Sequence, residues 1–327
     1  MRIESHAMNF LLCFFMLIAC LNSFARTNVT NVIDDVVLTY GIEGDRAVLL
    51  RAALSESEFS DVRKNIVIPK TVADSNVRAV ADDAFKSSHW LRSVTIQGSV
   101  TQIGRNAFAN CSNLLSVVLV EDSKSLGLRR INSFAFWNCV SLEDINLENA
   151  IHLSMIDGSA FEGCKSLKHI ELPERLYHFG DFAFRGCVSL QSMSLPVTAT
   201  DVPGNAFLGC VRLREIKIAP EGNYLFENGI LYDKTKSRLV RCFLGDQAES
   251  IKIDDGVTEI MPSAFAGCRH LKSVILPASL KRIGEFAFCD SGLKEIVLPA
   301  GLEDIGYAAF ADTPIKLDGR WANVNEL

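Results

Sequence analysis

The sequence lacks an excess of positive charge. Its 327 residues carry 33 lysines and arginines against 39 aspartates and glutamates, which gives a formal net charge of -6. The basic residues are scattered singly among the acidic ones, whereas proteins that bind nucleic acid gather theirs into a patch or stripe facing the phosphates. Nucleic acid is therefore not an expected partner.

The sequence also lacks the short motifs of common enzyme and metal chemistry. It contains no HExxH, GxSxG, GxGxxG or DxDxDG motif, and no CxxC pair with the usual spacing of zinc ligands. The six histidines fall mostly at variable positions of the chain and none is paired with a nucleophile, so they are interpreted as solvated side chains. We expect a protein that is not an enzyme and has no cofactor or metal site.

Long hydrophobic runs are scarce, and the longest lies near the N-terminus. Residues 10–21 read FLLCFFMLIACL, which is twelve apolar residues and too short for a membrane span of roughly 20. Such a run is typical of a signal peptide, and residues 1–25 are predicted to be one, with cleavage after Ala25. The alternative is residues 17–20 (LIAC), which resemble a bacterial lipobox and would make Cys20 a lipidated residue. Both routes predict export to the cell surface, the outer membrane or the medium, with a lipid anchor as the one possible membrane contact.

A repeated unit is what the sequence has in abundance. The Ala-Phe dipeptide recurs nine times, at spacings of 22 to 28 residues apart from one gap of 58. Its phenylalanines are Phe85, Phe108, Phe136, Phe161, Phe184, Phe207, Phe265, Phe288 and Phe310. A period near 23 lies within the range of roughly 20–29 residues of leucine-rich repeats.

The aligned unit reads LxxVxLPxxLxxIGxxAFxxC. In the LxxVxL part Val274 and Leu276 are two residues apart, which predicts a strand with both side chains inward, and Pro277 ends it. The IGxxAFxxC part is predicted to make one helical or 3-10 turn with alanine and phenylalanine inward. The expected fold class is an α/β leucine-rich-repeat solenoid, with a parallel strand sheet on one face and short helical or 3-10 turns opposite.

The chain resembles the BspA-type leucine-rich repeats of surface proteins from gut and oral bacteria and some protists. The motifs that carry the resemblance are IGxxAFxxC, as in residues 103–111, and LxxVxLP, as in residues 293–299. It covers about residues 36–317 and implies a solenoid with a role in adhesion to host or neighbouring cells. After the signal peptide we expect an N-terminal cap with a hairpin at 26–72, the solenoid at 73–319 with a hairpin insertion at about 221–248, and a tail at 320–327.

The cysteines follow the repeat. Six of the eight outside the signal peptide lie three residues after a repeat phenylalanine, and Ser88, Ser291 and Thr313 occupy the same position in other copies. A small residue that recurs at one position of every coil belongs to the interior, so free buried thiols are predicted. Disulfides are the alternative, because neighbouring coils about 5 Å apart are within bridging distance.

The predicted function is recognition. We expect an exported, non-catalytic adhesion protein that binds a protein or glycan through the open face of the strand sheet. The alternative is a structural spacer of the cell envelope without a specific ligand. The candidate binding residues are the outward strand positions Thr95, Val118, Asn146, Glu171, Ser194, Lys217, Ile275 and Val297, with Lys252 in the same column. A second outward column holds Ser93, Ser116, Asp144, His169, Ser192, Glu215, Ser273 and Glu295.

Overall fold

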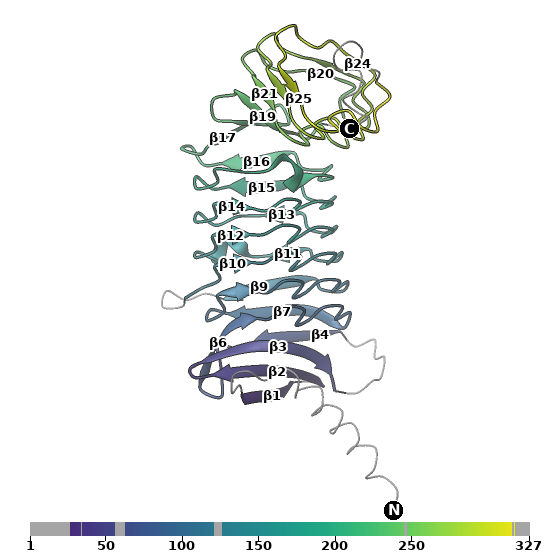
Figure 1. Ribbon diagram of the computed structural model, residues 1–327. Helices are drawn as coiled ribbons and strands as arrows, with labels where there is room; N and C mark the ends of the chain where they lie inside the picture. The colour runs from purple at the N-terminus through teal and green to yellow at the C-terminus, as the bar shows by residue number, and fades with distance from the viewer. Residues whose placement is uncertain are drawn as a thin grey trace, which may run out of the picture.

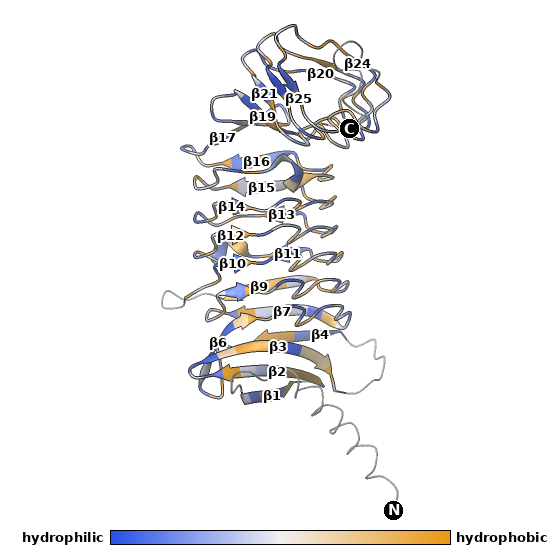
Figure 2. Cartoon of the chain, in the orientation of Figure 1, coloured by the Kyte–Doolittle hydropathy of each residue, from blue (hydrophilic) through white to orange (hydrophobic). Residues whose placement is uncertain are grey.

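The protein is an elongated stack of coils in the computed structural model (Figure 1). The structure describes residues 27–33, 35–55, 63–120, 126–244, 247–315 and 317. The predicted signal peptide, including Cys20, and the predicted tail at 320–327 lie outside the described residues. Each coil carries both hydrophobic and hydrophilic residues (Figure 2), because side chains along most strands point alternately inward and outward.

The N-terminal end of the stack is covered by three antiparallel strands. They are β1 (Thr27–Ile33), β2 (Val36–Glu43) and β3 (Arg46–Leu54), and they pair in the order β1-β2-β3. The short β5 (Thr71–Val72) and β6 (Ser75–Val80) follow, and β6 lies parallel to β3. The antiparallel strands therefore continue directly into the stack of parallel coils.

The LxxVxL part of each coil forms a strand, as the sequence predicts. These strands pair in parallel in three groups, β4-β7-β9-β11, β13-β15-β16 and β20-β22-β24. Their bounds are β4 (Lys64–Ile68), β7 (Leu91–Gln97), β9 (Ser116–Val120), β11 (Asp144–Ile145), β13 (His169–Ile170), β15 (Ser192–Leu195), β16 (Glu215–Ile218), β20 (Ser250–Lys252), β22 (Ser273–Ile275) and β24 (Glu295–Ile296). We call their outward side the strand face.

A second row of parallel strands, which the sequence analysis did not predict, ends at the isoleucine position of the IG pair. It consists of β8 (Gln102–Ile103), β10 (Arg130–Ile131), β12 (Met155–Ile156), β14 (His178–Phe179), β21 (Glu259–Ile260), β23 (Arg282–Ile283) and β25 (Asp304–Ile305). The sheet of β3 and β6 continues through β8, β10, β12 and β14. A second sheet begins at the hairpin described below and continues through β21, β23 and β25. Most coils therefore have two strands; in the coil of Phe207 the second is reduced to an isolated bridge between Asp201 and His178.

The prediction of helical or 3-10 turns opposite the sheet is wrong for most coils. In residues 104–111 the backbone is left-handed at Asn106 (φ 54°) and again at Asn110 (φ 60°), which interrupts any helix. The amides alternate: Ala109 donates within the turn to Asn106 (3.0 Å), and Phe108 donates to Ala135 of the next coil (2.7 Å). The segments therefore stack as turns bonded from coil to coil.

Only one copy of this segment is a 3-10 helix, η3 (Gly204–Phe207), and it is the copy that precedes the inserted hairpin. A second short helix among the described residues, η2 (Leu147–Asn149), follows β11. At η3 no following turn is available as a hydrogen-bond acceptor, so the segment bonds internally. The internal bonding of η3 therefore agrees with the view that the other copies remain turns because they bond to the next coil.

The residue after the repeat isoleucine is a glycine in some coils, and at Gly104 and Gly306 the closeness of the neighbouring coil requires it. Larger residues, Asn132, Asp157 and Met261, occupy the same position in other coils. A Cβ atom on Gly104 would lie 2.5 Å from both the carbonyl carbon of Ala81 and the amide nitrogen of Asp82. At Gly306 it would lie 2.5 Å from the amide nitrogen of Glu285. Backbone cannot move aside as a flexible side chain can, so a larger residue at these two positions would push neighbouring coils apart.

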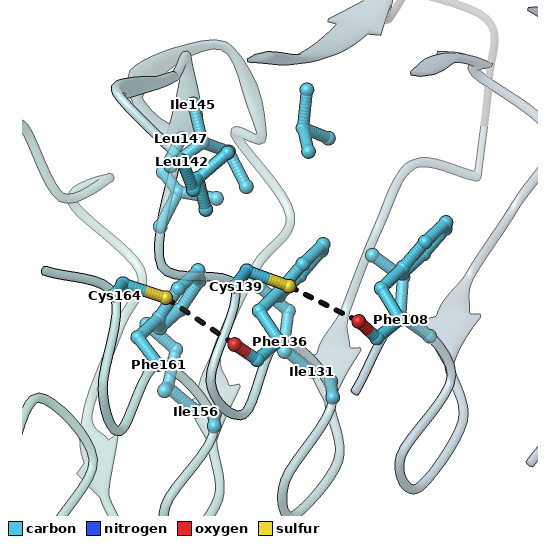
Figure 3. Packing of buried hydrophobic residues seen from close by; sticks show 14 of the residues in the cluster. Phe108, Ile131, Phe136, Cys139, Leu142, Ile145, Leu147, Ile156, Phe161 and Cys164 are labelled. Atoms are coloured by element: carbon cyan, nitrogen blue, oxygen red, sulfur yellow. Dashed lines mark hydrogen bonds between the residues drawn. The ribbon is translucent and has the colours of Figure 1, made fainter. Parts of the chain in front are cut away.

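In the coils from Phe85 to Phe207 the repeat phenylalanines and cysteines form two columns inside the stack, part of which Figure 3 shows. Neighbouring rings are nearly parallel, with centroids 5.1 Å apart between Phe108 and Phe136 and 5.2 Å apart between Phe136 and Phe161. From Cys111 to Cys210, each thiol of the column donates to a phenylalanine carbonyl of the preceding coil, as Cys139 does to Phe108 (3.0 Å). None of the eight cysteines among the described residues forms a disulfide, as predicted.

The gap of 58 residues contains three antiparallel strands, β17 (Tyr224–Glu227), β18 (Ile230–Asp233) and β19 (Arg238–Cys242). β19 also pairs in parallel with β21, so it serves as the second strand of its coil. We call residues 224–253, which include β20, the hairpin coil; it lacks the AFxxC turn. The direction of the stack changes at this coil, and the C-terminal coils are seen more nearly end-on in Figure 1.

Candidate functional site

The outward strand positions predicted from the sequence all reach the surface of the strand face. Val118 is 39% exposed, Ile275 57% and Val297 85%. Glu171, Lys217 and Lys252 are exposed as well, and Thr95, Asn146 and Ser194 are half-buried. Strand register places some of them side by side, since Thr95 pairs with Val118, Ser194 with Lys217, and Lys252 with Ile275.

Two of the predicted binding residues are occupied by backbone contacts. The Asn146 side chain accepts from the amide of Leu119 (2.7 Å) and donates to its carbonyl (3.1 Å). The Ser194 hydroxyl accepts from the amide of Leu172 (2.8 Å). These side chains replace strand-to-strand hydrogen bonds just beyond the ends of the short strands β11 and β13, which gives them a structural role.

The exposed apolar residues do not form one patch. Val118 belongs to the N-terminal coils, whereas Ile275 and Val297 belong to the C-terminal ones, beyond the hairpin coil. Between them the column holds Glu171 and Lys217, whose charged groups lie 4.0 Å apart. The three apolar residues that sequence analysis grouped together therefore belong to two separate regions of the strand face.

The structure adds two residues that the sequence analysis missed. Val67 is 45% exposed and Val120 48%, and both lie on the same side of the sheet as Val118. Val67 was assigned to the cap, and Val120 follows the last inward residue of its strand. Both could have been found only by extending the period-two strand pattern beyond the repeat consensus. We call Val67, Val118 and Val120 the N-terminal apolar patch, and Ile275 with Val297 the C-terminal apolar patch.

The second outward column links neighbouring coils through polar side chains. Ser93 donates to Asn65 (2.7 Å), His169 bonds Ser192 (2.7 Å), and Ser273 donates to Ser250 (2.9 Å). The strand face is therefore a polar ladder beside an apolar or charged column. Such a surface can contact a partner over many coils without a deep pocket.

The described residues offer no cluster of metal-ligating side chains. In the part of the chain that the structure describes, no three His, Cys, Asp or Glu side chains converge as metal ligands. The same residues include no helix of the length and apolarity needed to cross a membrane. Burial raises the pKa of Cys210 to about 12, so this thiol stays protonated near neutral pH.

The chain belongs to the family of BspA type leucine rich repeat regions. The family model matches residues 54–152, 129–237 and 236–316, with six copies of the repeat. The repeat motif, the two rows of parallel strands and the stacked phenylalanines agree with this assignment. A search of curated proteins gave no match.

Solved structures show the same fold. A leucine rich cell surface protein from Faecalibacterium prausnitzii is 23% identical, with 89% of this chain and 82% of that one covered and a TM-score of 0.57. The pneumococcal vaccine antigen PcpA is 19% identical, with 89% and 81% covered and a TM-score of 0.56. A leucine-rich repeat protein from Eubacterium ventriosum is 16% identical, with 89% and 73% covered and a TM-score of 0.52.

Proposed function

We propose that this protein is an exported, non-catalytic recognition protein that binds a protein or glycan through its strand face. The observation that carries the proposal is the N-terminal apolar patch, in which Val67, Val118 and Val120 expose apolar side chains on a sheet bordered by polar ones. Exposed apolar clusters with a polar rim are typical of interaction sites. The Faecalibacterium protein of the same fold is described as a cell surface protein, which supports a similar location here.

Binding is tested with the purified chain lacking residues 1–25 on a glycan array and in pull-downs from host-cell surface preparations. Replacing Val67, Val118 and Val120 by lysine should abolish binding of the ligand so identified, and the fold should survive because the side chains are exposed. The matched control replaces Ile151 and Tyr177 by lysine. These two residues are about as exposed as the three valines but lie off the strand face. Undiminished binding by the triple variant would place the ligand elsewhere.

The C-terminal apolar patch is tested separately. Ile275→Lys with Val297→Lys keeps the N-terminal patch intact, so loss of binding only in this variant would move the site beyond the hairpin coil. If the wild-type chain binds no glycan and no surface protein, the spacer role becomes the better explanation.

Export is tested in the organism that produces the protein. We expect a mature chain that has lost its N-terminal segment and is found in the envelope or the medium. Metabolic labelling with palmitate distinguishes lipidation of Cys20 from cleavage after Ala25. Full-length cytosolic protein that retains residues 1–20 would contradict export.

A further inference from the structure

The hairpin coil leaves a gap in the stack of turns. Where one AFxxC turn follows another directly, the amide two residues after the phenylalanine donates to the next turn, as Gly186 does to Leu208 and Gly267 to Cys289 (2.8 Å each). After Phe207 the next such turn belongs to Phe265, because the hairpin coil has none. One turn is therefore missing from an otherwise continuous face.

The missing turn leaves a notch with a volume of about 890 Å³. This is within the range of roughly 300–1,000 Å³ that is usual for ligand sites. One wall is the turn of residues 208–211, the other is the turn of residues 266–270, and Arg241 and Phe243 line the notch between them. The notch lies on the turn side of the coils, away from the strand face.

The first wall presents an unused peptide donor. Gly209 occupies the position that donates to the next coil elsewhere, and its amide has no hydrogen-bond acceptor among the described residues. Its backbone is left-handed (φ 79°), as at the equivalent Gly186 and Gly267, so the amide keeps the orientation it has in a regular coil. It therefore points toward the space that a following turn would fill.

Arg241 supplies a positive charge at the base of the notch. Its side chain is only 5% exposed, and it donates to the carbonyls of Ser263 and Ala266. The Ala266 carbonyl is equivalent to that of Leu208, which accepts a backbone amide from the preceding coil. The guanidinium thus replaces the amide of the missing turn.

The charge of Arg241 is not neutralised within the part of the chain that the structure describes. No ion pair among the described residues involves Arg241. The buried Nε atom of Arg241 has no hydrogen-bond partner either. A guanidinium has five N–H donors, and here two are used. The acid that lines the notch, Asp290, is already bound to Arg269 (2.7 Å). A buried charge of this kind is strongly stabilised by an anion.

We infer that the notch binds an acidic peptide segment of a partner protein. A carboxylate of the peptide pairs with Arg241, and a peptide carbonyl accepts from Gly209, in the way that the missing turn would. A peptide fits better than a free ion because the gap has the width of one turn of chain and offers a backbone donor as well as a charge. Val188 and Val211 add exposed apolar contacts at its edge.

The test measures binding of a fluorescently labelled hexaglutamate peptide to the mature chain by anisotropy, with hexaglutamine as the uncharged control. We expect hexaglutamate to bind, to weaken with added salt, and to outcompete hexaglutamine. Arg241→Gln keeps amide donors for the two carbonyls but removes the charge, so affinity should fall by at least about tenfold. Arg241→Lys keeps the charge and should retain most of the affinity.

A second pair of variants avoids the buried arginine. Val211→Lys should tighten hexaglutamate binding and Val211→Glu should weaken it, by about threefold or more each, because Val211 is exposed at the notch. The same substitutions at Val197, which is similarly exposed but does not line the notch, should have no effect.

Three results would overturn the inference. They are no binding of hexaglutamate, equal binding of hexaglutamate and hexaglutamine, and equal binding by the Val211 and Val197 variants. Binding of dextran sulfate without hexaglutamate would also overturn it and would assign the notch to anionic glycans. None of these results depends on the strand face, so failure here and failure of the proposed recognition surface are distinguishable.

Discussion

The coils before and after the hairpin coil are built from the same unit but form two separate cores. The N-terminal core contains six stacked rings from Phe85 to Phe207, with neighbouring centroids between 4.9 and 5.8 Å apart. The C-terminal core contains three, Phe265, Phe288 and Phe310, at 4.9 and 5.1 Å. No ring of the first column stacks directly on one of the second, because Phe243 of the hairpin coil, tilted by 56° against Phe207, follows the first column.

The hairpin coil separates the cores because its strands are buried on both sides. Leu231 and Val240 pack into the N-terminal core, whereas Ile230, Tyr232 and Leu239 pack into the C-terminal one. In a repeat stack each unit contacts its neighbours, and stability is approximately a sum of units and interfaces. A few coils of this unit therefore form a core of their own. The coupling between the two cores depends on the hairpin coil.

The largest expected effect comes from removing one ring of each column. Phe161→Ala and Phe288→Ala both delete a fully buried ring that has a neighbour on each side, at a cost of about 3–5 kcal/mol. In the shorter C-terminal stack this loss should be enough to unfold those coils alone. Hydrogen exchange should then rise across residues 251–315 and remain unchanged across residues 91–195. Equal exchange on both sides of the hairpin coil would show one cooperative core.

A smaller effect is expected from Arg241→Met, which tests how strongly the hairpin coil couples the N-terminal and C-terminal cores. The change leaves the carbonyls of Ser263 and Ala266 without their side-chain donors, at a cost of about 1–3 kcal/mol. We expect thermal unfolding to separate into two transitions, measured by calorimetry. The matched control Arg212→Met alters an exposed arginine and should leave the transition unchanged.

Cys187→Ser should cost about 1 kcal/mol, at the low end for burial of a hydroxyl. The buried thiol of Cys187 donates to the carbonyl of Phe161 (3.2 Å), and a serine hydroxyl can use the same acceptor. Chemical denaturation measures the loss. The reverse change, Ser88→Cys in the first copy, should be neutral or slightly stabilising, and a large loss there would contradict a shared column.

The smallest expected effect is that of reductant. Because none of the eight cysteines of the coils forms a disulfide, unfolding midpoints with and without dithiothreitol should agree. Mass spectrometry of the folded chain should show no loss of hydrogens from thiol pairs. A clear drop in the midpoint under reductant would mean that neighbouring thiols of the column are bridged in solution.

The outward strand positions could be predicted because a strand has a period of two and each repeat marks its own register. Val118, Ile275 and Val297 therefore lie at the surface as expected. The roles of Asn146 and Ser194 could not be predicted, because each bonds the backbone of another coil. The notch was missed because it is formed by a turn that is absent, and the sequence shows only an insertion there.

The repeat pattern is enough to predict the solenoid, its period and its inward residues, because a single coil must bury the same apolar positions in every copy. The form of the AFxxC segment depends instead on contacts between coils. Locally its residues could make a helical turn, but each coil lies close enough to the next for Phe108 and its equivalents to bond across, and left-handed residues such as Asn106 keep the amides in that direction. Contacts between coils, which no single repeat contains, therefore replaced the expected helix with a stack of turns and left a notch where one turn is missing.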